Sequence, residues 1–259
     1  MAPFGKFDER ISTENLDAKI VWRYVDLAKF MDLFVKRRIY FRRSDLFDDV
    51  YEGMPTTPLL KDVKANFQSV HKAVPGIWKN SAAAAKKSLL ELRERNFINS
   101  WYLSDYESAA MWSLYSKIGS GIAIRSTVKR LRDAIPDAVH PDIYIGRILY
   151  VDYKDAKIDN SHDLRSQFFL KRNHFEHERE IRVLYSAKNR DPKKEGHYIE
   201  NIDLDVMIDK IVLAPKTADW FEESIKAFLS SVGCAKEVVP SALETKPPIM
   251  ARRRPKKPK

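Results

Sequence analysis

The residues best suited to chemistry lie in one acidic run, residues 175–182, in the second half of the chain. The continuation of this run, residues 181–185, alternates as a β-strand does, and successive side chains of a strand point to opposite faces. If the strand reaches back to Glu178, then Glu178, Glu180 and Arg182 share one face. Neighbouring carboxylates are unfavourable unless water, a cation or a ligand uses them. The run therefore indicates either a functional carboxylate pair or the solvated face of a half-exposed strand.

Basic residues near apolar segments form a second set of candidates. Arg23 lies between Trp22 and Tyr24 within a predicted apolar strand. An arginine in such a strand pairs with a carboxylate, lies on a wet face or binds a ligand. Lys171 precedes the acidic run and is a candidate partner for its carboxylates.

An acidic turn and an aromatic helix are the remaining candidates. Asp49 and Glu52 follow a predicted strand and a short turn, where we favour a role in capping the turn over a role in a site. Trp112 and Tyr115 are three residues apart on one helix face, a spacing that more often reflects core packing.

Other familiar sites are not indicated by the sequence. No glycine-rich phosphate loop of the Walker or Rossmann form is present. His174 and His177 lie near glutamates, but no third histidine accompanies them, so we predict no metal site. Cys234 is the one cysteine, which excludes an internal disulfide and favours a thiol in the core.

Composition predicts a globular protein. The 259 residues, 44% of them hydrophobic, suffice for a sizeable core. No apolar run approaches the roughly 20 residues that span a membrane, and the start of the chain has no apolar signal core, so we expect a cytoplasmic protein without a membrane partner.

The net charge of +10 is concentrated at the end of the chain. Seven basic residues and no acid lie within residues 246–259, so subtracting seven leaves about +3 for the remainder. Four prolines accompany them, and we predict a disordered basic tail over residues 244–259. This tail either binds nucleic acid through counterion release or only solvates the chain.

The pattern of elements predicts an α+β domain over residues 20–243, preceded by an N-terminal arm over residues 1–19. Strands are expected at residues 20–25, 39–42, 97–103, 122–124, 144–153, 211–213 and 236–239. Helices are expected at residues 27–37, 59–73, 80–95, 109–115, 127–134, 163–174 and 217–232. Asp26 and Thr127 or Ser126 are expected to cap two of these helices, and a capping box over residues 104–107 a third. The helices within residues 59–95 read as an insertion.

Together the motifs resemble a widespread bacterial family, domain of unknown function twenty-nine seventy-one. The resemblance covers residues 20–243 and rests on segments 22–24, 40–53, 111–115 and 171–182, in that order. Asp48, Val50, Phe175 and His177 depart from the family pattern, which has asparagine, proline, tryptophan and tyrosine there. The family name carries no activity.

A more distant likeness is to ADP-ribosyltransferases, which implies a mixed, mostly antiparallel, split sheet and NAD as substrate. By position, Glu178 or Glu180 would be catalytic, as a carboxylate that stabilises the oxocarbenium-like transition state. The implied dinucleotide-binding residues are Arg23, Tyr24, Trp112, Tyr115 and Arg182. The resemblance further implies a bacterial toxin or phage-defence effector that modifies a nucleic-acid or protein acceptor.

Two alternatives of other classes stay open at this point. In a metal-dependent nucleic-acid-processing effector, Asp49, Glu52, Glu178 and Glu180 would converge on a divalent metal. In a noncatalytic interaction module, the acidic run and Arg182 would form an internal ion network with Arg23 and Lys171, without an open cleft beside it.

Overall fold

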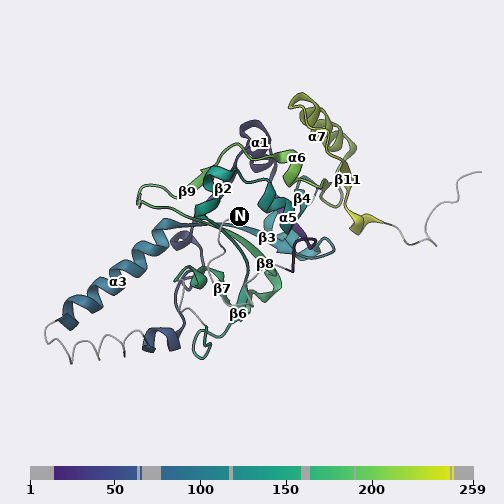
Figure 1. Ribbon diagram of the computed structural model, residues 1–259. Coiled ribbons are helices and arrows are strands. Elements are labelled where there is room, and N and C mark those ends of the chain that lie inside the picture. Colours follow the sequence, from purple (N-terminus) through teal and green to yellow (C-terminus); the bar gives the residue numbers. More distant parts are fainter. Residues whose placement is uncertain are drawn as a thin grey trace, which may run out of the picture.

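Nine strands form one mixed sheet in a computed structural model of the chain, which describes residues 15–62, 65, 77–116, 119–158, 164–189, 191–245 and 247 (Figure 1). Along the sheet the order is β11 (Val238–Pro240), β10 (Lys210–Leu213), β4 (Ile122–Thr127), β1 (Ile20–Val25), β3 (Asn96–Leu103), β2 (Ile39–Arg43) and β9 (Gly196–Ile199). The remaining two strands, β8 (Glu180–Ser186) and β5 (Ile143–Arg147), continue from β3. All pairs in this sheet are antiparallel except β10 with β11, so the predicted α+β class with a mostly antiparallel mixed sheet is confirmed.

The sheet divides at β3. Strand β8 pairs with one edge of β3 along residues 96–102. The opposite edge is shared, because β1 pairs at Tyr102 and Leu103 whereas β2 pairs at Phe97 and Ile98. The residues between these two pairings therefore have no described strand beside them on that edge, and β1 and β2 diverge there.

Two side chains bond with the backbone at this division. Asn99 Nδ2 donates to the carbonyl oxygen of Tyr40 at 2.8 Å. Arg23 Nη1 donates to the carbonyl oxygen of Ser100 at 2.7 Å. Because buried backbone groups need hydrogen-bond partners, these polar side chains make the opening of the sheet tolerable.

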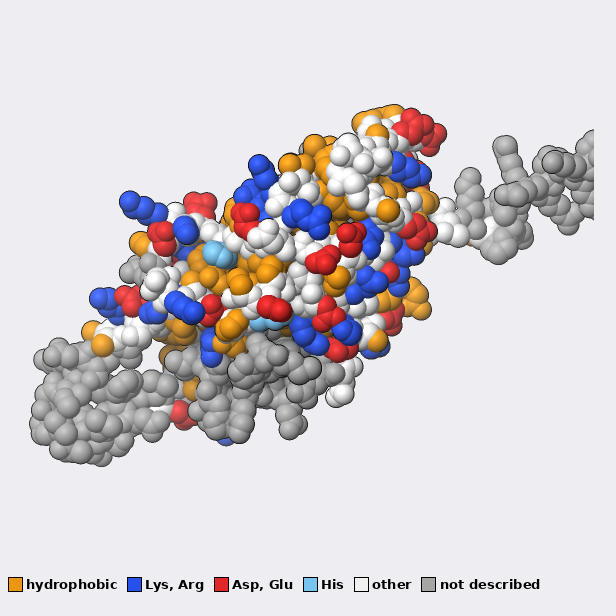
Figure 2. Space-filling view, turned by 45° about the horizontal axis from the view of Figure 1, so that its top comes forward, with side chains coloured by type: hydrophobic (Ala, Val, Ile, Leu, Met, Phe, Trp, Pro, Cys, Tyr) orange, Lys and Arg blue, Asp and Glu red, His pale blue; other side chains and the backbone are white. Residues whose placement is uncertain are grey.

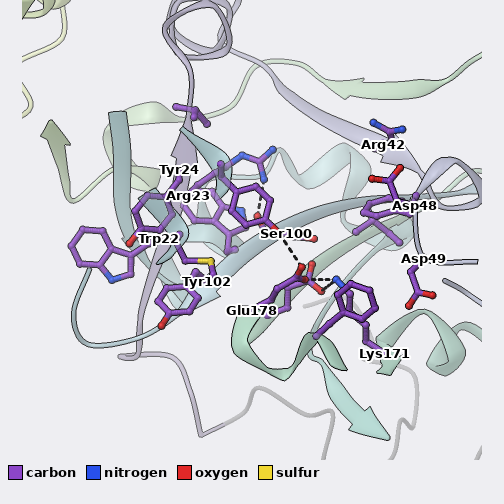
Figure 3. Close-up of a pocket in the computed structure, with 18 of the residues that line it drawn as sticks. Trp22, Arg23, Tyr24, Arg42, Asp48, Asp49, Ser100, Tyr102, Lys171 and Glu178 are labelled. Carbon is purple, nitrogen blue, oxygen red and sulfur yellow. Dashed lines mark hydrogen bonds and ion pairs between the residues drawn. The ribbon is translucent and has the colours of Figure 1, made fainter. Parts of the chain in front are cut away.

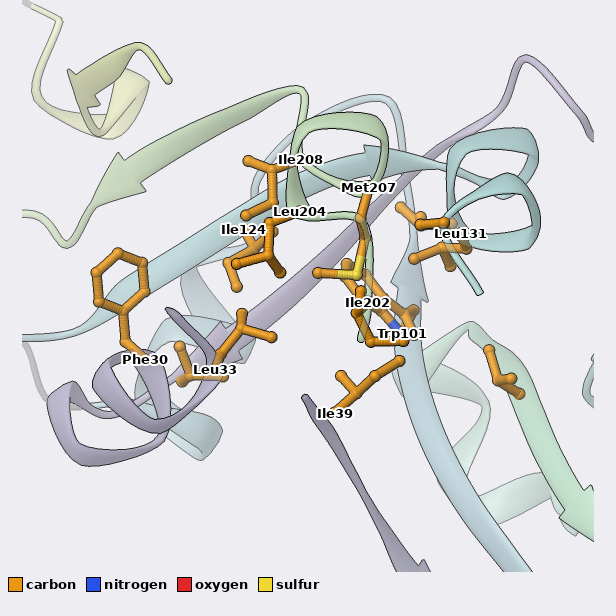
Figure 4. Close-up of a cluster of buried hydrophobic side chains, with 14 of the residues drawn as sticks. Phe30, Leu33, Ile39, Trp101, Ile124, Leu131, Ile202, Leu204, Met207 and Ile208 are labelled. Atoms are coloured by element: carbon orange, nitrogen blue, oxygen red, sulfur yellow. The ribbon is translucent and has the colours of Figure 1, made fainter. Parts of the chain in front are cut away.

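The main hydrophobic core lies on one face of the sheet (Figure 4). Helices α1 (Leu27–Lys36), α5 (Val128–Asp133), α6 (Leu204–Met207) and α7 (Asp219–Ser231) pack their apolar side chains against it. Phe30 of α1 and Trp101 of β3 are almost completely buried there. Burial of each such side chain contributes roughly 1.5–3 kcal/mol, so this face holds the sheet in place.

The opposite face is covered by smaller clusters. Met111 and Trp112 of α4 (Ala109–Tyr115) pack against Trp22 and Tyr24 of β1. Ile98 of β3 belongs to a separate cluster on that face. Between these clusters the face carries polar side chains, and it is here that the site lies.

The helical insertion projects away from the sheet (Figure 1). Helix α3 (Ile77–Arg95) is longer than the predicted segment 80–95, and residues 57–62 are helical where we expected residues 59–73. Apart from residue 65, the rest of that first helix lies outside the described residues, as do most of the N-terminal arm and nearly all of the basic tail.

Local signals predicted two of three helix caps. Asp26 accepts from the amide of Lys29 at 2.8 Å and Thr127 from that of Arg130 at 3.2 Å, as expected. The capping box over residues 104–107 is wrong. Ser108 caps α4 instead. Glu107 accepts from the indole of Trp112 at 2.9 Å, because burial of that ring requires a partner for its N–H.

Two element predictions fail around the acidic run. The expected strand over residues 144–153 breaks into β5 and β6 (Leu149–Val151). The expected helix over residues 163–174 is a 3-10 turn (Leu164–Phe169), then β7 (Leu170–Arg172), which pairs in parallel with β6, then a second 3-10 turn. Residues 166–171 are all buried, and six consecutive residues cover every side of an α-helix, so an amphipathic helix with one exposed face does not fit here.

Charges of both signs are mixed on the surface of the described residues. Figure 2 shows Lys and Arg side chains interspersed with Asp and Glu over the face in view. Within the described part of the chain, no helix has both the length and the apolar character needed to cross a membrane.

Candidate functional site

A cleft of about 430 Å³ opens where β1 and β2 diverge (Figure 3). Its lining combines aromatic rings with cations and carboxylates. Rings come from Trp22, Tyr24, Tyr40, Phe47, Trp101, Tyr102, Tyr115 and Phe175. The charged lining residues include Arg23, Lys29, Arg42, Lys171, Glu178 and Glu180.

The acidic side of the cleft begins at the first residue of β8. Glu180 pairs with Tyr102 and Arg182 with Ser100 in the β3–β8 register, so Glu180 and Arg182 share one face as predicted. The strand does not reach Glu178, which ends the 3-10 turn η4 (Asn173–Glu178). Arg179 between the two glutamates is left-handed, with φ of 41°, and this turn breaks the alternation.

Glu178 nevertheless lies beside Glu180, through contacts between distant segments. Its Oε2 forms an ion pair with Lys171 Nζ, and its Oε1 accepts from the hydroxyl of Tyr115 at 3.0 Å. Lys171 Nζ is also 3.5 Å from Glu180 Oε2. One ammonium group therefore lies beside both carboxylates, and its charge offsets the repulsion between them.

Arg182 is the buried centre of this arrangement and does not reach the cleft. Its guanidinium donates to Glu52 Oε1 at 2.5 Å, to Glu180 Oε2 at 2.8 Å and to the carbonyl oxygen of Phe168. The side chains of Arg182 and Glu52 have no exposed surface. We call Glu52, Lys171, Glu178, Glu180 and Arg182 the charge cluster.

The charge cluster sets the protonation of its members. Burial by itself raises the pKa of Glu180, but Arg182 and Lys171 outweigh it and hold that pKa below its usual 4.5. Burial raises the pKa of Glu52, and the nearby charge of Glu180 adds to this. Burial and the neighbouring Glu178 raise the pKa of the Tyr115 hydroxyl, which therefore stays protonated and donates. Glu180 is consequently ionised at neutral pH.

The acidic turn supplies Glu52 to the cluster but keeps Asp49 apart. Gly53 has φ of +66°, and a Cβ there would lie 2.4 Å from the ring of Phe168, so the turn requires glycine. Asp49 accepts from Arg172 Nη2 at 2.8 Å and from the amide of Tyr51 at 3.0 Å. Asp49 therefore has the turn-capping role that we favoured, whereas Glu52 has a buried ion pair.

The basic side of the cleft is built differently. Arg23 is partly buried, donates to Ser100 and lies with its Cζ 5.9 Å from the centroid of the Trp101 ring. Among the described residues it has no carboxylate partner. Burial lowers the pKa of Arg23 to about 10, which still leaves it charged at neutral pH. Arg42 likewise donates to a backbone carbonyl, that of Leu46, at 2.6 and 3.1 Å.

The predicted aromatic residues divide between the cleft and the core. Tyr115 and Tyr24 line the cleft, and the Tyr24 hydroxyl accepts from the amide of Ser108 at 2.8 Å. Trp112 is 1% exposed and packs edge-on against Tyr24, with ring centroids 4.9 Å apart. Trp112 therefore supports the aromatic wall from behind.

The four carboxylates of the metal-dependent alternative are each matched with a cation. Asp49 pairs with Arg172, whereas Glu52, Glu178 and Glu180 belong to the charge cluster. Among the residues that the structure describes, no group of three or more His, Cys, Asp and Glu side chains is arranged to hold a metal ion. The interaction-module alternative required Arg23 in the ion network and no open cleft. In the described structure Arg23 lies outside that network, and an open cleft is present.

Two site residues had no signal in the sequence. The hydroxyl of Tyr150, on β6, accepts from the backbone amide of Glu180 at 2.9 Å and orients the first residue of β8. The carbonyl of Ser100 holds Arg23. Both contacts depend on strand pairing between distant segments. Phe175 places an aromatic ring beside Lys171, 4.9 Å from Nζ to centroid.

Comparison with known proteins does not place the chain in a family. Models of protein families, curated proteins and solved structures gave no significant match. The geometry and charge of the cleft are therefore the basis on which a function is assigned.

Proposed function

We propose that the cleft binds NAD and that the chain is an ADP-ribosyltransferase-like enzyme, which transfers ADP-ribose to a nucleic-acid or protein acceptor. One observation carries the proposal: a single aromatic-walled cleft contains Arg23, a cation with no acidic partner among the described residues, and an ionised carboxylate, Glu180. NAD has a diphosphate, planar rings and a glycosidic bond to a cationic ring. In the cleft, Arg23 matches the diphosphate, the aromatic wall matches the planar rings, and Glu180 matches the sugar at the bond that breaks.

The proposed chemistry breaks the bond between the ribose C1′ and the nicotinamide nitrogen. Nicotinamide leaves with the bonding electron pair, positive charge builds on the sugar, and an acceptor nucleophile then bonds to C1′ and loses its proton. A fixed carboxylate beside the sugar lowers the barrier through electrostatic stabilisation. The enzyme needs no acid or base for the first step, because the leaving group is neutral after departure.

Glu180 suits the catalytic role better than Glu178. Glu180 is the first residue of a central strand, and its Oε2 is held by Arg182 at 2.8 Å and faces Lys171 at 3.5 Å. Its lowered pKa keeps it charged. Glu178 lies on a 3-10 turn and is bonded by Tyr115 and Lys171, so we assign it to orienting the acceptor or the ribose.

The basic and aromatic groups take the other parts of the ligand. Arg23 has N–H groups beyond the one that Ser100 accepts, and a guanidinium is well matched to phosphate oxygens. Tyr24 and Tyr115 would contact the planar rings, with Trp112 behind them. Arg182 orients Glu180 from the buried side and would not contact the dinucleotide.

The resemblance to domain of unknown function twenty-nine seventy-one fits this proposal, since its motifs supply Arg23, Glu52, Tyr115, Lys171 and both glutamates. A role as a bacterial toxin or phage-defence effector follows as part of the same proposal. The metal-dependent alternative is less well supported, because no group of three or more His, Cys, Asp and Glu side chains among the described residues is arranged to hold a metal ion.

The test is release of nicotinamide from NAD, measured with and without nucleic acid and protein acceptors. Glu180→Gln keeps the shape of the side chain and removes its charge, and we expect about a 10²- to 10³-fold slower release. Glu178→Gln should slow acceptor labelling more than it slows nicotinamide release. Glu237→Gln, which changes an exposed glutamate paired with Lys210, is the matched control.

Two outcomes would contradict the proposal. The first is no nicotinamide release by the wild type under any acceptor condition. The second is near-normal release by both Glu180→Gln and Glu178→Gln, because the carboxylates would then have no part in the mechanism. A thermal unfolding curve for each variant separates loss of activity from loss of fold.

A further inference from the structure

A row of aromatic and basic side chains continues from the cleft onto the edge of the sheet. Strand β9 pairs with β2 so that Tyr198 lies opposite Tyr40, and Gly196 opposite Arg42. Tyr40 and Arg42 both line the cleft. Tyr198 therefore extends the same face away from the cleft, and we call Tyr40, Arg42 and Tyr198 the edge platform.

The rings of the edge platform are held in place yet remain accessible. Their centroids are 5.1 Å apart, and Tyr40 and Tyr198 are 38% and 39% exposed. A Cβ on Gly196 would lie 2.1 Å from the Tyr40 ring, so this ring covers the glycine backbone. Arg38 lies 3.7 Å from the centroid of the Tyr198 ring. Half-exposed rings that are fixed in this way lose little side-chain entropy when a ligand stacks on them.

Arg42 is the cation beside these rings that suits an anionic ligand. Arg42 bonds to a backbone carbonyl and, among the described residues, has no carboxylate partner. Arg23, further into the cleft, has none either. Arg38 is matched by Asp32 at 2.8 Å and lies 3.9 Å from Glu200, so it serves to fix Tyr198. Unmatched cations thus lie along the same path as the accessible rings.

We infer that the edge platform docks single-stranded nucleic acid, which it leads toward the cleft. Stacking platforms beside cations are how proteins bind single strands, because the faces of the bases and the phosphates are both reachable. In a duplex the base faces are covered by their neighbours and cannot stack on Tyr40 or Tyr198. The role of the nucleic acid as the acceptor of ADP-ribose rests on the proposed function. The binding of the nucleic acid to the edge platform does not rest on it.

The experiment is fluorescence anisotropy with the full chain and a labelled single strand of about ten nucleotides, compared with a duplex of the same length and without NAD. We expect the single strand to bind more tightly. Tyr198→Ala and Arg42→Gln should each weaken binding about tenfold, whereas Tyr198→Phe keeps the ring and should bind as the wild type does. Matched controls are Tyr106→Ala and Lys188→Gln, both of them exposed residues outside the cleft lining.

The outcomes separate this inference from the proposed function. Equal affinity of the wild type and Tyr198→Ala, or equal affinity for the duplex, would overturn the docking surface and assign any binding to other basic segments. Labelling of protein in place of nucleic acid would overturn only the role of the bound nucleic acid as acceptor. If Tyr198→Ala weakens binding but the wild type never releases nicotinamide, the docking surface stands and the transferase proposal fails.

Discussion

The two sides of the cleft handle charge in opposite ways. On the β8 side, the charge cluster surrounds each carboxylate with cations of the protein itself, and Arg182 at its centre has no exposed surface. On the β1 side, Arg23 has a carbonyl oxygen and an aromatic ring but no acid among the described residues. The first side is electrostatically complete without a ligand, and the second is not.

This difference distinguishes charges that stabilise the fold from a charge that is available to a ligand. Removing one partner from a buried, matched set leaves an uncompensated charge and is strongly destabilising. A partly buried cation without an acid already carries a desolvation cost in the free protein. A ligand anion would offset that cost, so we expect Arg23 to contribute to ligand binding more than to stability.

The largest expected effect concerns the matched side. Arg182→Met leaves Glu52 and Glu180 buried near each other without their guanidinium, and we expect the free energy of unfolding to fall by about 3–5 kcal/mol. Urea unfolding measures this. Arg125→Met removes a more exposed arginine from its pair with Asp209 and should cost about 1 kcal/mol or less. Similar losses in both variants would mean that the charge cluster is not the structural centre of the cleft.

The next effect concerns the unmatched side. Arg23→Met removes a costly buried charge but also the donor to the Ser100 carbonyl, so the free energy of unfolding should change by no more than about 1 kcal/mol. Affinity for NAD, measured by calorimetry, should fall about 10- to 100-fold, as expected for a lost charged hydrogen bond. Unchanged affinity together with a large loss of stability would reverse the comparison between the two sides.

The smallest effect is a pH dependence of stability. The pKa of Glu180 is lowered in the folded protein, so its stabilising contribution is present above the unfolded value of about 4.5 and is lost as pH falls below it. The raised pKa of Glu52 acts in the opposite sense and partly offsets this. Urea unfolding between about pH 7 and about pH 4 should show a smaller acid loss in Glu180→Gln than in the wild type. Parallel curves would contradict the lowered pKa.

Local patterns in the chain predicted the elements that position the site. Alternation identified β1 with Arg23 inside it, and it placed Glu180 and Arg182 on one face of β8. The caps at Asp26 and Thr127 followed from side chains that bond within three residues of themselves. Such features need no information about the rest of the molecule.

The failures cluster where distant segments meet. The sequence predicts a helix over residues 163–174, yet the described residues there form two 3-10 turns on either side of β7, with residues 168–170 fully buried. The break before Glu180 depends on the left-handed backbone of Arg179. An arginine gives no sign of this conformation in the sequence, as a glycine would. Trp112 and Tyr115 share a helix, but only packing against β1 separates the buried ring from the accessible one.

By itself the sequence determined which charged and aromatic residues are available, and the α+β class in which they are arranged. Only the tertiary structure decided that Lys171 joins Glu178 to Glu180, that Arg182 pairs with Glu52, and that Arg23 has no acid beside it in the part of the chain that the structure describes. The physical reason is that an ion pair depends on distance in space. These partners are brought together by the register of β3 with β8 and by the divergence of β1 from β2, which no local pattern encodes.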